Sequence, residues 1–199
     1  MNAVWRDDLH AFLGELEHPA WGTAHSRRVY DLALRLAAQE GMHVDADCLY
    51  AAAHLHDLGA LEPYREEGVD HTERSLQAAP AVLDRVGFDP DRIDRVIGCI
   101  RGHMFYAKPE NWPEDLVFHD ADTLDFMGHI GIARLLSIVG DDDWTPDLRS
   151  AVELVRRFRL ELPDTLTTAS ARFIAKARRT EMEAFLEGVS EATDGLRFL

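Results

Sequence analysis

Residues 51–59 of this 199-residue chain read Ala-Ala-Ala-His-Leu-His-Asp-Leu-Gly. The apolar lead-in predicts a buried helix, and Gly59 marks its expected end. The adjacent pair His56 and Asp57 is costly to bury there, because a carboxylate is rarely buried unless it is paired or bound to a metal. Imidazole nitrogen and carboxylate oxygen both suit first-row divalent metals. The stretch therefore predicts part of a metal site.

The pattern around this stretch is helical nearly throughout. Apolar residues recur at helical spacing, and helix starts are marked by Asp45, by the capping-box spacing of 70–73 and by Asp89-Pro90. No alternating strand pattern of useful length is visible, so we predict an all-α helical bundle. We expect a single domain over 1–199, with a core at about 20–140 and C-terminal helices at about 145–192 packed on it. The expected helices cover 4–16, 25–40, 45–59, 70–86, 89–103, 114–127, 129–139, a segment from 145 and 166–189.

Composition and charge exclude several classes of function. The formal net charge of −15 argues against a nucleic acid polymer as partner, because a polyanion would be repelled. The basic clusters 156–159 and 176–179 are expected to be solvated helix faces, with an arginine that reaches a substrate phosphate as the alternative. No apolar run approaches the roughly 18 residues of a membrane span, and the N-terminus does not resemble a signal peptide. Cys48 and Cys99 lie in apolar helical stretches and are expected to be reduced thiols in the core, so we expect a cytoplasmic protein. The sequence is also compatible with a homodimer.

Two further residues extend the His-Asp pair into a motif. His25 lies upstream and Asp122 lies downstream, within Asp120-Ala121-Asp122-Thr123-Leu124-Asp125. The order His…His-Asp…Asp resembles the HD superfamily of metal-dependent phosphohydrolases. The Asp120–Asp125 stretch with Gly128–Arg134 is similar to a segment of a bacterial subgroup of uncharacterised HD phosphohydrolases.

The resemblance implies that His25, His56, Asp57 and Asp122 hold a divalent metal ion, with water in the open coordination positions. It does not distinguish Mg, Mn, Fe, Co, Ni and Zn, and a second ion stays open. Asp120 points away from Asp122 on a helix, whereas Asp125 shares its face. We therefore expect Asp125 to accept a hydrogen bond from one of the metal-ligating side chains or to form an ion pair with an arginine such as Arg134.

Histidines between the central pair and the final aspartate are candidates for the same site. His103 is expected there either as a hydrogen-bond donor to the substrate phosphate or as a ligand of a second metal ion. For His71, such a role and an exposed place beside a helix cap are both open. Arg28, three residues after His25 on the same helix face, is a further candidate for neutralising phosphate.

The expected activity is hydrolysis of a small phosphorylated molecule, with a nucleotide as one option, by a metal-activated water. Some HD families carry a glutamate three residues after the aspartate to position this water. Here that residue is Ala60, so the candidates for the task are Asp57 itself and a metal-bound hydroxide. The alternatives are a di-iron oxygenase on the same scaffold and a non-catalytic regulatory module.

The segment 104–113 holds two prolines and three aromatic residues, and it joins two elements that carry site candidates. Loops placed by rigid helices commonly carry specificity. We predict that Phe105 or Tyr106 lines the pocket and selects the organic part of the substrate. The alternative is that these aromatics only cover helix ends.

Overall fold

The structure is a computed structural model, and it describes residues 4–14, 16, 18–110 and 112–199. Within these residues the chain forms nine α-helices and two short 3-10 helices and contains no strand, so the all-α prediction is confirmed. No helix among them is long and apolar enough to cross a membrane. The helices are α1 (Val4–Leu13), α2 (Thr23–Glu40), α3 (Ala46–Leu55), η1 (Leu58–Ala60), α4 (His71–Arg85), η2 (Pro90–Arg92), α5 (Ile93–Gly102), α6 (Pro113–Asp125), α7 (Gly128–Ser137), α8 (Leu148–Thr165) and α9 (Ala169–Ala192).

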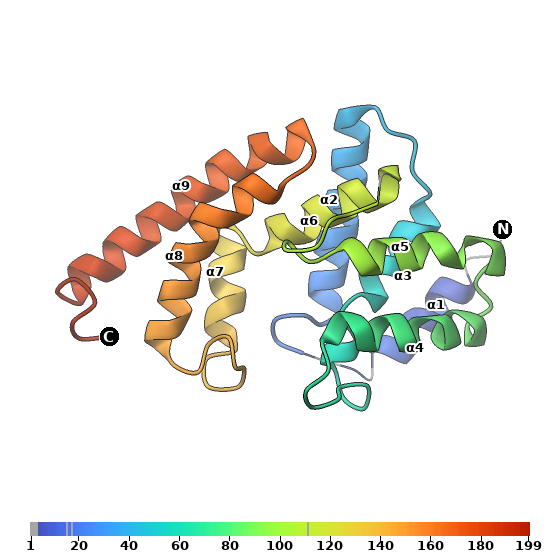
Figure 1. Cartoon of the computed structure of the whole chain (residues 1–199), viewed down its shortest axis with the longest axis horizontal. Helices are drawn as coiled ribbons and strands as arrows, with labels where there is room; N and C mark the ends of the chain where they lie inside the picture. The colour runs from blue at the N-terminus through green and yellow to red at the C-terminus, as the bar shows by residue number, and fades with distance from the viewer. Residues whose placement is uncertain (1–3, 15, 17, 111) are drawn as a thin grey trace.

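The helices form two groups that meet along α6 (Figure 1). Helices α1 to α5 lie on one side, where α2 packs along α6 and α3 packs on α5. Helices α7, α8 and α9 lie on the other side, and α9 also contacts α2 and α6. One continuous apolar core joins both groups, and its fully buried members include Leu36, Leu55 and Phe118. Each such side chain contributes about 1.5–3 kcal/mol through burial, and together they fix α2, α3 and α6 against one another.

The end of the first quoted helix differs from the sequence prediction. Helix α3 ends at Leu55, and η1 carries the chain past Gly59. Gly59 lies against the backbone of α4, where an added Cβ would come within 2.2 Å of the His71 carbonyl oxygen. Its N–H donates to Ser75 Oγ at 2.8 Å. Gly59 is therefore a contact point between η1 and α4, not the end of the helix, and this contact sets His71 close to Asp57.

Two further boundaries depend on polar contacts that helical spacing does not reveal. Helix α8 begins after Asp147, whose side chain accepts from the Ser150 N–H, and the predicted start at Thr145 is wrong. Thr145 is instead buried, and its hydroxyl donates to the Ile138 carbonyl at 3.0 Å. At the start of α9, the N–H groups of Thr167 and Thr168 both donate to Asp120 of α6 at 2.7 Å. Asp120 thus points away from the predicted metal site, as expected.

Candidate metal centre

Four side chains from three segments converge below the molecular surface, and they are the four predicted metal ligands. His25 Nε2 of α2 lies 3.0 Å from His56 Nε2 and 3.3 Å from Asp122 Oδ1 of α6. Asp57 Oδ2 lies 3.4 Å from His25 Nε2 and 3.2 Å from His56 Nε2. His25, His56 and Asp122 are buried, whereas Asp57 is partly exposed. The fold therefore brings the predicted set together at one point.

The donor set fits a divalent cation. His56 Nδ1–H donates to the Ala53 carbonyl at 3.0 Å, and His25 Nδ1–H donates to Asp125 Oδ2 at 2.7 Å. A neutral ring that donates from Nδ1 presents a lone pair at Nε2, so two lone pairs face each other. Asp122 Oδ1 is buried beside them, and no described residue gives it a well-formed hydrogen bond. A metal ion would relieve the repulsion between these converging lone pairs and carboxylates. Metal-binding histidines also typically donate their other ring N–H to a carbonyl or carboxylate, as both rings do here through Nδ1.

Without a cation, the charge of the carboxylates is balanced by protons on the rings. Burial lowers the pKa of His56, but Asp57 and Asp122 outweigh burial and raise that pKa to about 10. The pKa of His25 is also raised, because its carboxylate partners outweigh burial and the charge of Arg134. In turn, the two rings hold the pKa of Asp57 well below its usual range against the effect of burial. A metal ion bound here would take the place of these protons, and its binding would release them.

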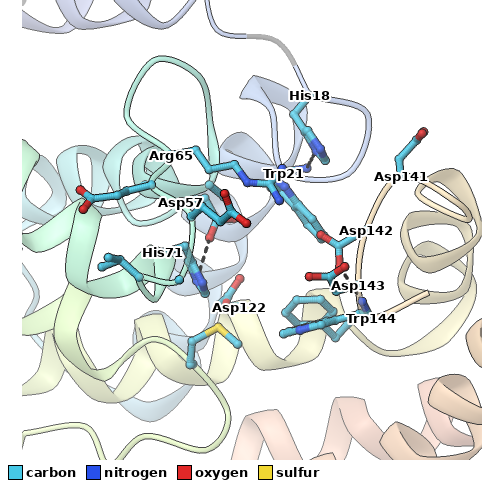
Figure 2. Close-up of a pocket in the computed structure, with 18 residues that line it drawn as sticks. His18, Trp21, Asp57, Arg65, His71, Asp122, Asp141, Asp142, Asp143 and Trp144 are labelled. Atoms are coloured by element: carbon cyan, nitrogen blue, oxygen red, sulfur yellow. Dashed lines mark hydrogen bonds and ion pairs between the residues drawn. The ribbon is translucent and has the colours of Figure 1, made fainter. Parts of the chain in front are cut away.

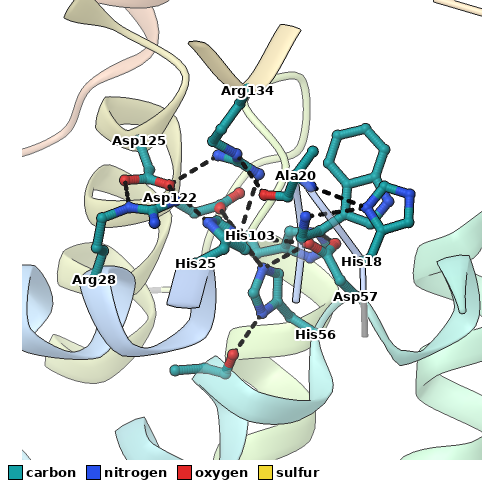
Figure 3. A network of polar contacts seen from close by, with 12 residues as sticks. His18, Ala20, His25, Arg28, His56, Asp57, His103, Asp122, Asp125 and Arg134 are labelled. Carbon is teal, nitrogen blue, oxygen red and sulfur yellow. Dashed lines mark hydrogen bonds and ion pairs between the residues drawn. The ribbon is translucent and has the colours of Figure 1, made fainter. Parts of the chain in front are cut away.

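Asp125 connects the cluster to two arginines (Figure 3). Besides accepting from His25, it accepts from Arg28 Nε and Nη2 at 3.0 and 2.9 Å and from Arg134 Nη1 at 3.0 Å. The predicted pairing of Asp125 with Arg134 is therefore present. Arg28 is held by the same carboxylate and is not among the described residues that line the cavity, so its contact with a substrate phosphate stays a prediction. The two guanidinium groups fix Asp125, and Asp125 fixes the orientation of His25.

A second group lies on the other side of Asp57. Asp57 Oδ1 is 3.6 Å from His71 Nε2 and 3.9 Å from His103 Nε2, and the two Nε2 atoms are 3.4 Å apart. His103 is fully buried, and its Nδ1–H donates to the Ile100 carbonyl at 2.6 Å. Burial and the neighbouring His56 lower the pKa of His103 to about 4. Its ring is therefore neutral near neutral pH, with a lone pair at Nε2 directed at Asp57 and His71.

A cavity of about 310 Å³ opens onto both groups (Figure 2). Asp57, Asp122 and His71 line it at the metal cluster. Ala60, where other families carry the water-positioning glutamate, lines it as well. The remaining walls come from residues 65–69, from His18 with Trp21, and from the loop 141–144 between α7 and α8.

Several of these wall residues were not predicted from the sequence. His18 had no spacing that marked it, but its Nδ1 accepts from the N–H groups of Ala20 and Trp21 at 3.2 Å, and its ring stacks on Trp21. Arg65 lies in the segment expected to be a plain loop, and it is the one Lys or Arg among the described residues that line the cavity. The run Asp141-Asp142-Asp143-Trp144 is the sequence signal that would have pointed to the third wall.

The aromatic residues predicted to line the pocket lie elsewhere. The Phe105 ring packs on Phe158 and Phe126, at centroid distances of 5.2 and 6.5 Å. Tyr106 is 60% exposed, and its hydroxyl donates to Asp70 at 3.4 Å. From this segment, the neighbouring Met104 reaches the cavity instead. The alternative expectation, that these aromatics cover helix ends, describes Phe105.

The site and fold agree with comparisons to known proteins. The HD domain family matches residues 22–127, which is more than half of the chain. The chain therefore belongs to the HD domain family, and it has the fold of the HD-superfamily hydrolases.

Individual relatives cover nearly the whole chain. The uncharacterized protein YpgQ of Bacillus subtilis is 28% identical over 179 residues, which span 86% of this chain and 84% of YpgQ. The crystal structure of YpgQ in complex with ADP superposes with a TM-score of 0.71 at 26% identity, covering 95% of this chain and 98% of YpgQ. A predicted HD superfamily hydrolase from an uncultured Thermotogales bacterium gives a TM-score of 0.60 at 25% identity, covering 95% and 88%.

Proposed function

We propose that the protein is a metal-dependent phosphohydrolase that acts on a small phosphorylated molecule, with a nucleotide as the best candidate. The observation that carries the proposal is the convergence of His25, His56, Asp57 and Asp122 where a cavity reaches the cluster. A site with protein ligands on one side and an accessible cavity on the other is typical of catalytic metal centres. The complex of YpgQ with ADP supports a phosphorylated ligand for a relative of this fold.

In this proposal His25, His56, Asp57 and Asp122 hold a divalent metal ion. When bound, the ion polarises a phosphoryl oxygen and lowers the pKa of a water molecule. With a single ion bound, Asp57 Oδ1 would accept a proton from that water, because Ala60 offers no carboxylate for the task. Asp57 is suited to this, since its two oxygens face the two different histidine groups. With a second ion on Asp57 Oδ1, the ions alone would have to acidify the water.

The hydrogen bonds of His103 help to decide whether His71 and His103 contact the substrate phosphate or bind a second metal ion. His103 donates from Nδ1 to Ile100, so its neutral ring has no proton at Nε2 to give to a phosphate. This favours His103 as a ligand of a second metal ion, together with Asp57 Oδ1 and His71. Of the cavity side chains, Arg65 then remains to neutralise phosphate by direct contact.

Elemental analysis of the purified protein, followed by a phosphatase screen with different divalent ions, tests the proposal. We expect at least one tightly bound ion per chain and metal-dependent release of phosphate or pyrophosphate from nucleotides. A protein that holds no metal and releases neither product with any ion would be a regulatory module. Two bound irons with oxygen consumption would instead identify an oxygenase.

A further inference from the structure

The cavity extends well beyond the candidate metal centre. Its volume of about 310 Å³ lies at the lower end of the roughly 300–1,000 Å³ of small-molecule pockets, so it has room for an organic group beside a phosphate. At one end Asp122 presents a buried oxygen that receives no hydrogen bond from the described part of the chain, next to Asp57 and His71. At the other end the lining changes to tryptophan and aspartate (Figure 2). The two ends therefore differ in chemistry.

The far end contains two tryptophans that are held in place, and one of them, Trp144, stays exposed. Trp21 stacks on His18, with ring centroids 4.7 Å apart and an interplanar angle of 6°, and the Arg134 guanidinium lies 5.8 Å from its centroid. Trp144 remains 37% exposed, although its ring packs on Phe126 at 6.0 Å. Fixed aromatic rings at a cavity wall offer a stacking surface at little entropic cost.

The loop that carries Trp144 is fixed by its own hydrogen bonds. The Trp144 N–H donates to Asp142 Oδ1 at 2.8 Å, and the Gly140 N–H donates to the Thr145 carbonyl at 2.9 Å. The buried hydroxyl of Thr145 anchors the loop to Ile138. The position of Trp144 is therefore set before any ligand binds.

The charges that line the cavity determine which part of a ligand lies at the far end. Three consecutive carboxylates, Asp141 to Asp143, line the far end, whereas Arg65 projects across the cavity from the segment between η1 and α4. Within the described residues no ion pair engages Arg65. Phosphate oxygens are repelled by the aspartates and attracted by Arg65 and by a metal ion at the other end. Ionised carboxylates only accept hydrogen bonds, so the group at the far end has to supply donors.

We infer that Trp21, Trp144 and the aspartates of the 141–143 loop form a subsite for a flat, amino-bearing heterocycle. The substrates are then nucleoside phosphates whose base carries an amino group. This rests on the proposed phosphohydrolase function. The heterocycle stacks on the exposed ring of Trp144, while its amino group donates to an aspartate of the loop. The phosphates extend past Arg65 toward Asp57 and Asp122.

Binding of nucleotide pairs that differ by one amino group tests the subsite. Guanosine against inosine diphosphate and adenosine against purine riboside diphosphate form such pairs, with inorganic pyrophosphate as a probe without a base. Titration calorimetry on the full chain with Mn²⁺ is expected to show roughly ten-fold tighter binding of the amino-bearing member in at least one pair. In that pair, Asp142→Asn or Asp143→Asn should reduce the preference.

Trp144→Ala should weaken binding of the preferred nucleotide roughly ten-fold and leave pyrophosphate binding unchanged. The matched control is Trp112→Ala, which removes a similarly exposed tryptophan (41%) outside the cavity lining. Asp84→Asn removes one exposed negative charge on α4 and controls for net charge. Equal affinity within both pairs, or equal effects of the two tryptophan variants, would overturn the subsite.

Product analysis in the same samples separates the two proposals. Preferential binding without release of phosphate or pyrophosphate would contradict the hydrolase function and support the subsite. Hydrolysis of all probes without any preference for an amino group would support the hydrolase and exclude the subsite.

Discussion

The two sides of Asp57 are built differently. On the Oδ2 side, His25, His56 and Asp122 are buried, and both rings are fixed through Nδ1. On the Oδ1 side, His103 is buried and fixed, but His71 lines the cavity, and its Nδ1 lies 4.0 Å from the exposed Asp70. A preorganised ligand set binds more tightly than one that must be ordered. If the proposed function holds, the comparison predicts a tightly bound ion on the first side and a more weakly bound, exchangeable ion on the second.

Removal of the shared carboxylate should have the largest effect. We expect Asp57→Ala to lose metal from both sides and to reduce hydrolysis to the level of the chelated wild type. Elemental analysis and a nucleotide hydrolysis assay measure the two effects, and helical circular dichroism should stay largely intact. Full metal content in this variant would show that the ligand assignment is wrong.

His103→Ala should affect one side only. The variant is expected to keep the ion on the Oδ2 side, to fall from about two ions to about one per chain in excess metal, and to lose most of its turnover. His25→Ala is the counterpart on the other side and should lose the tightly bound ion first. A His103→Ala variant with wild-type metal content and activity would make His103 a packing residue.

The outer contact of His25 should have an intermediate effect. We expect Asp125→Asn to lower the affinity for the tightly bound ion about 10–100-fold, because a hydrogen-bond partner such as Asp125 orients the ligating His25 ring. The variant keeps the side-chain shape but loses the charge that Arg28 and Arg134 neutralise. Titration with a competing chelator measures the affinity, and thermal unfolding of the metal-free variant checks the fold. An unchanged affinity would mean that the ring is held by packing alone.

Tyr106→Ala should change little, in contrast to the original prediction for this residue. Its side chain is exposed and makes one long hydrogen bond to Asp70, so kcat/KM should stay within about two-fold. A loss confined to nucleotide substrates, with a generic phosphate ester unaffected, would show that the segment 104–113 moves onto bound substrate.

The sequence predicted those parts of the molecule that local pattern or ligand chemistry determines. Helix order followed from spacing, and the four residues that converge in the structure were predicted from the resemblance of the His…His-Asp…Asp order to the HD superfamily. The walls of the cavity could not be predicted in this way. Trp21, Arg65 and Trp144 lie in connecting segments, and only the packing of α7 to α9 on the remaining helices brings Trp144 near the metal cluster. Phe105 was misassigned because an aromatic residue in a loop fits a cavity wall and a core contact equally well.

The buried carboxylate of Asp120 has a consequence for where this protein can be divided. It is fully buried and accepts from the N–H and hydroxyl groups of both Thr167 and Thr168. A fragment cut after 127, where the match to the HD family ends, would leave this charge without donors and would uncover the α6 face that contacts α9. We therefore expect the unit that unfolds cooperatively to extend beyond the region that the HD family matches. In hydrogen exchange, the amides of α6 and of the first turn of α9 should open together.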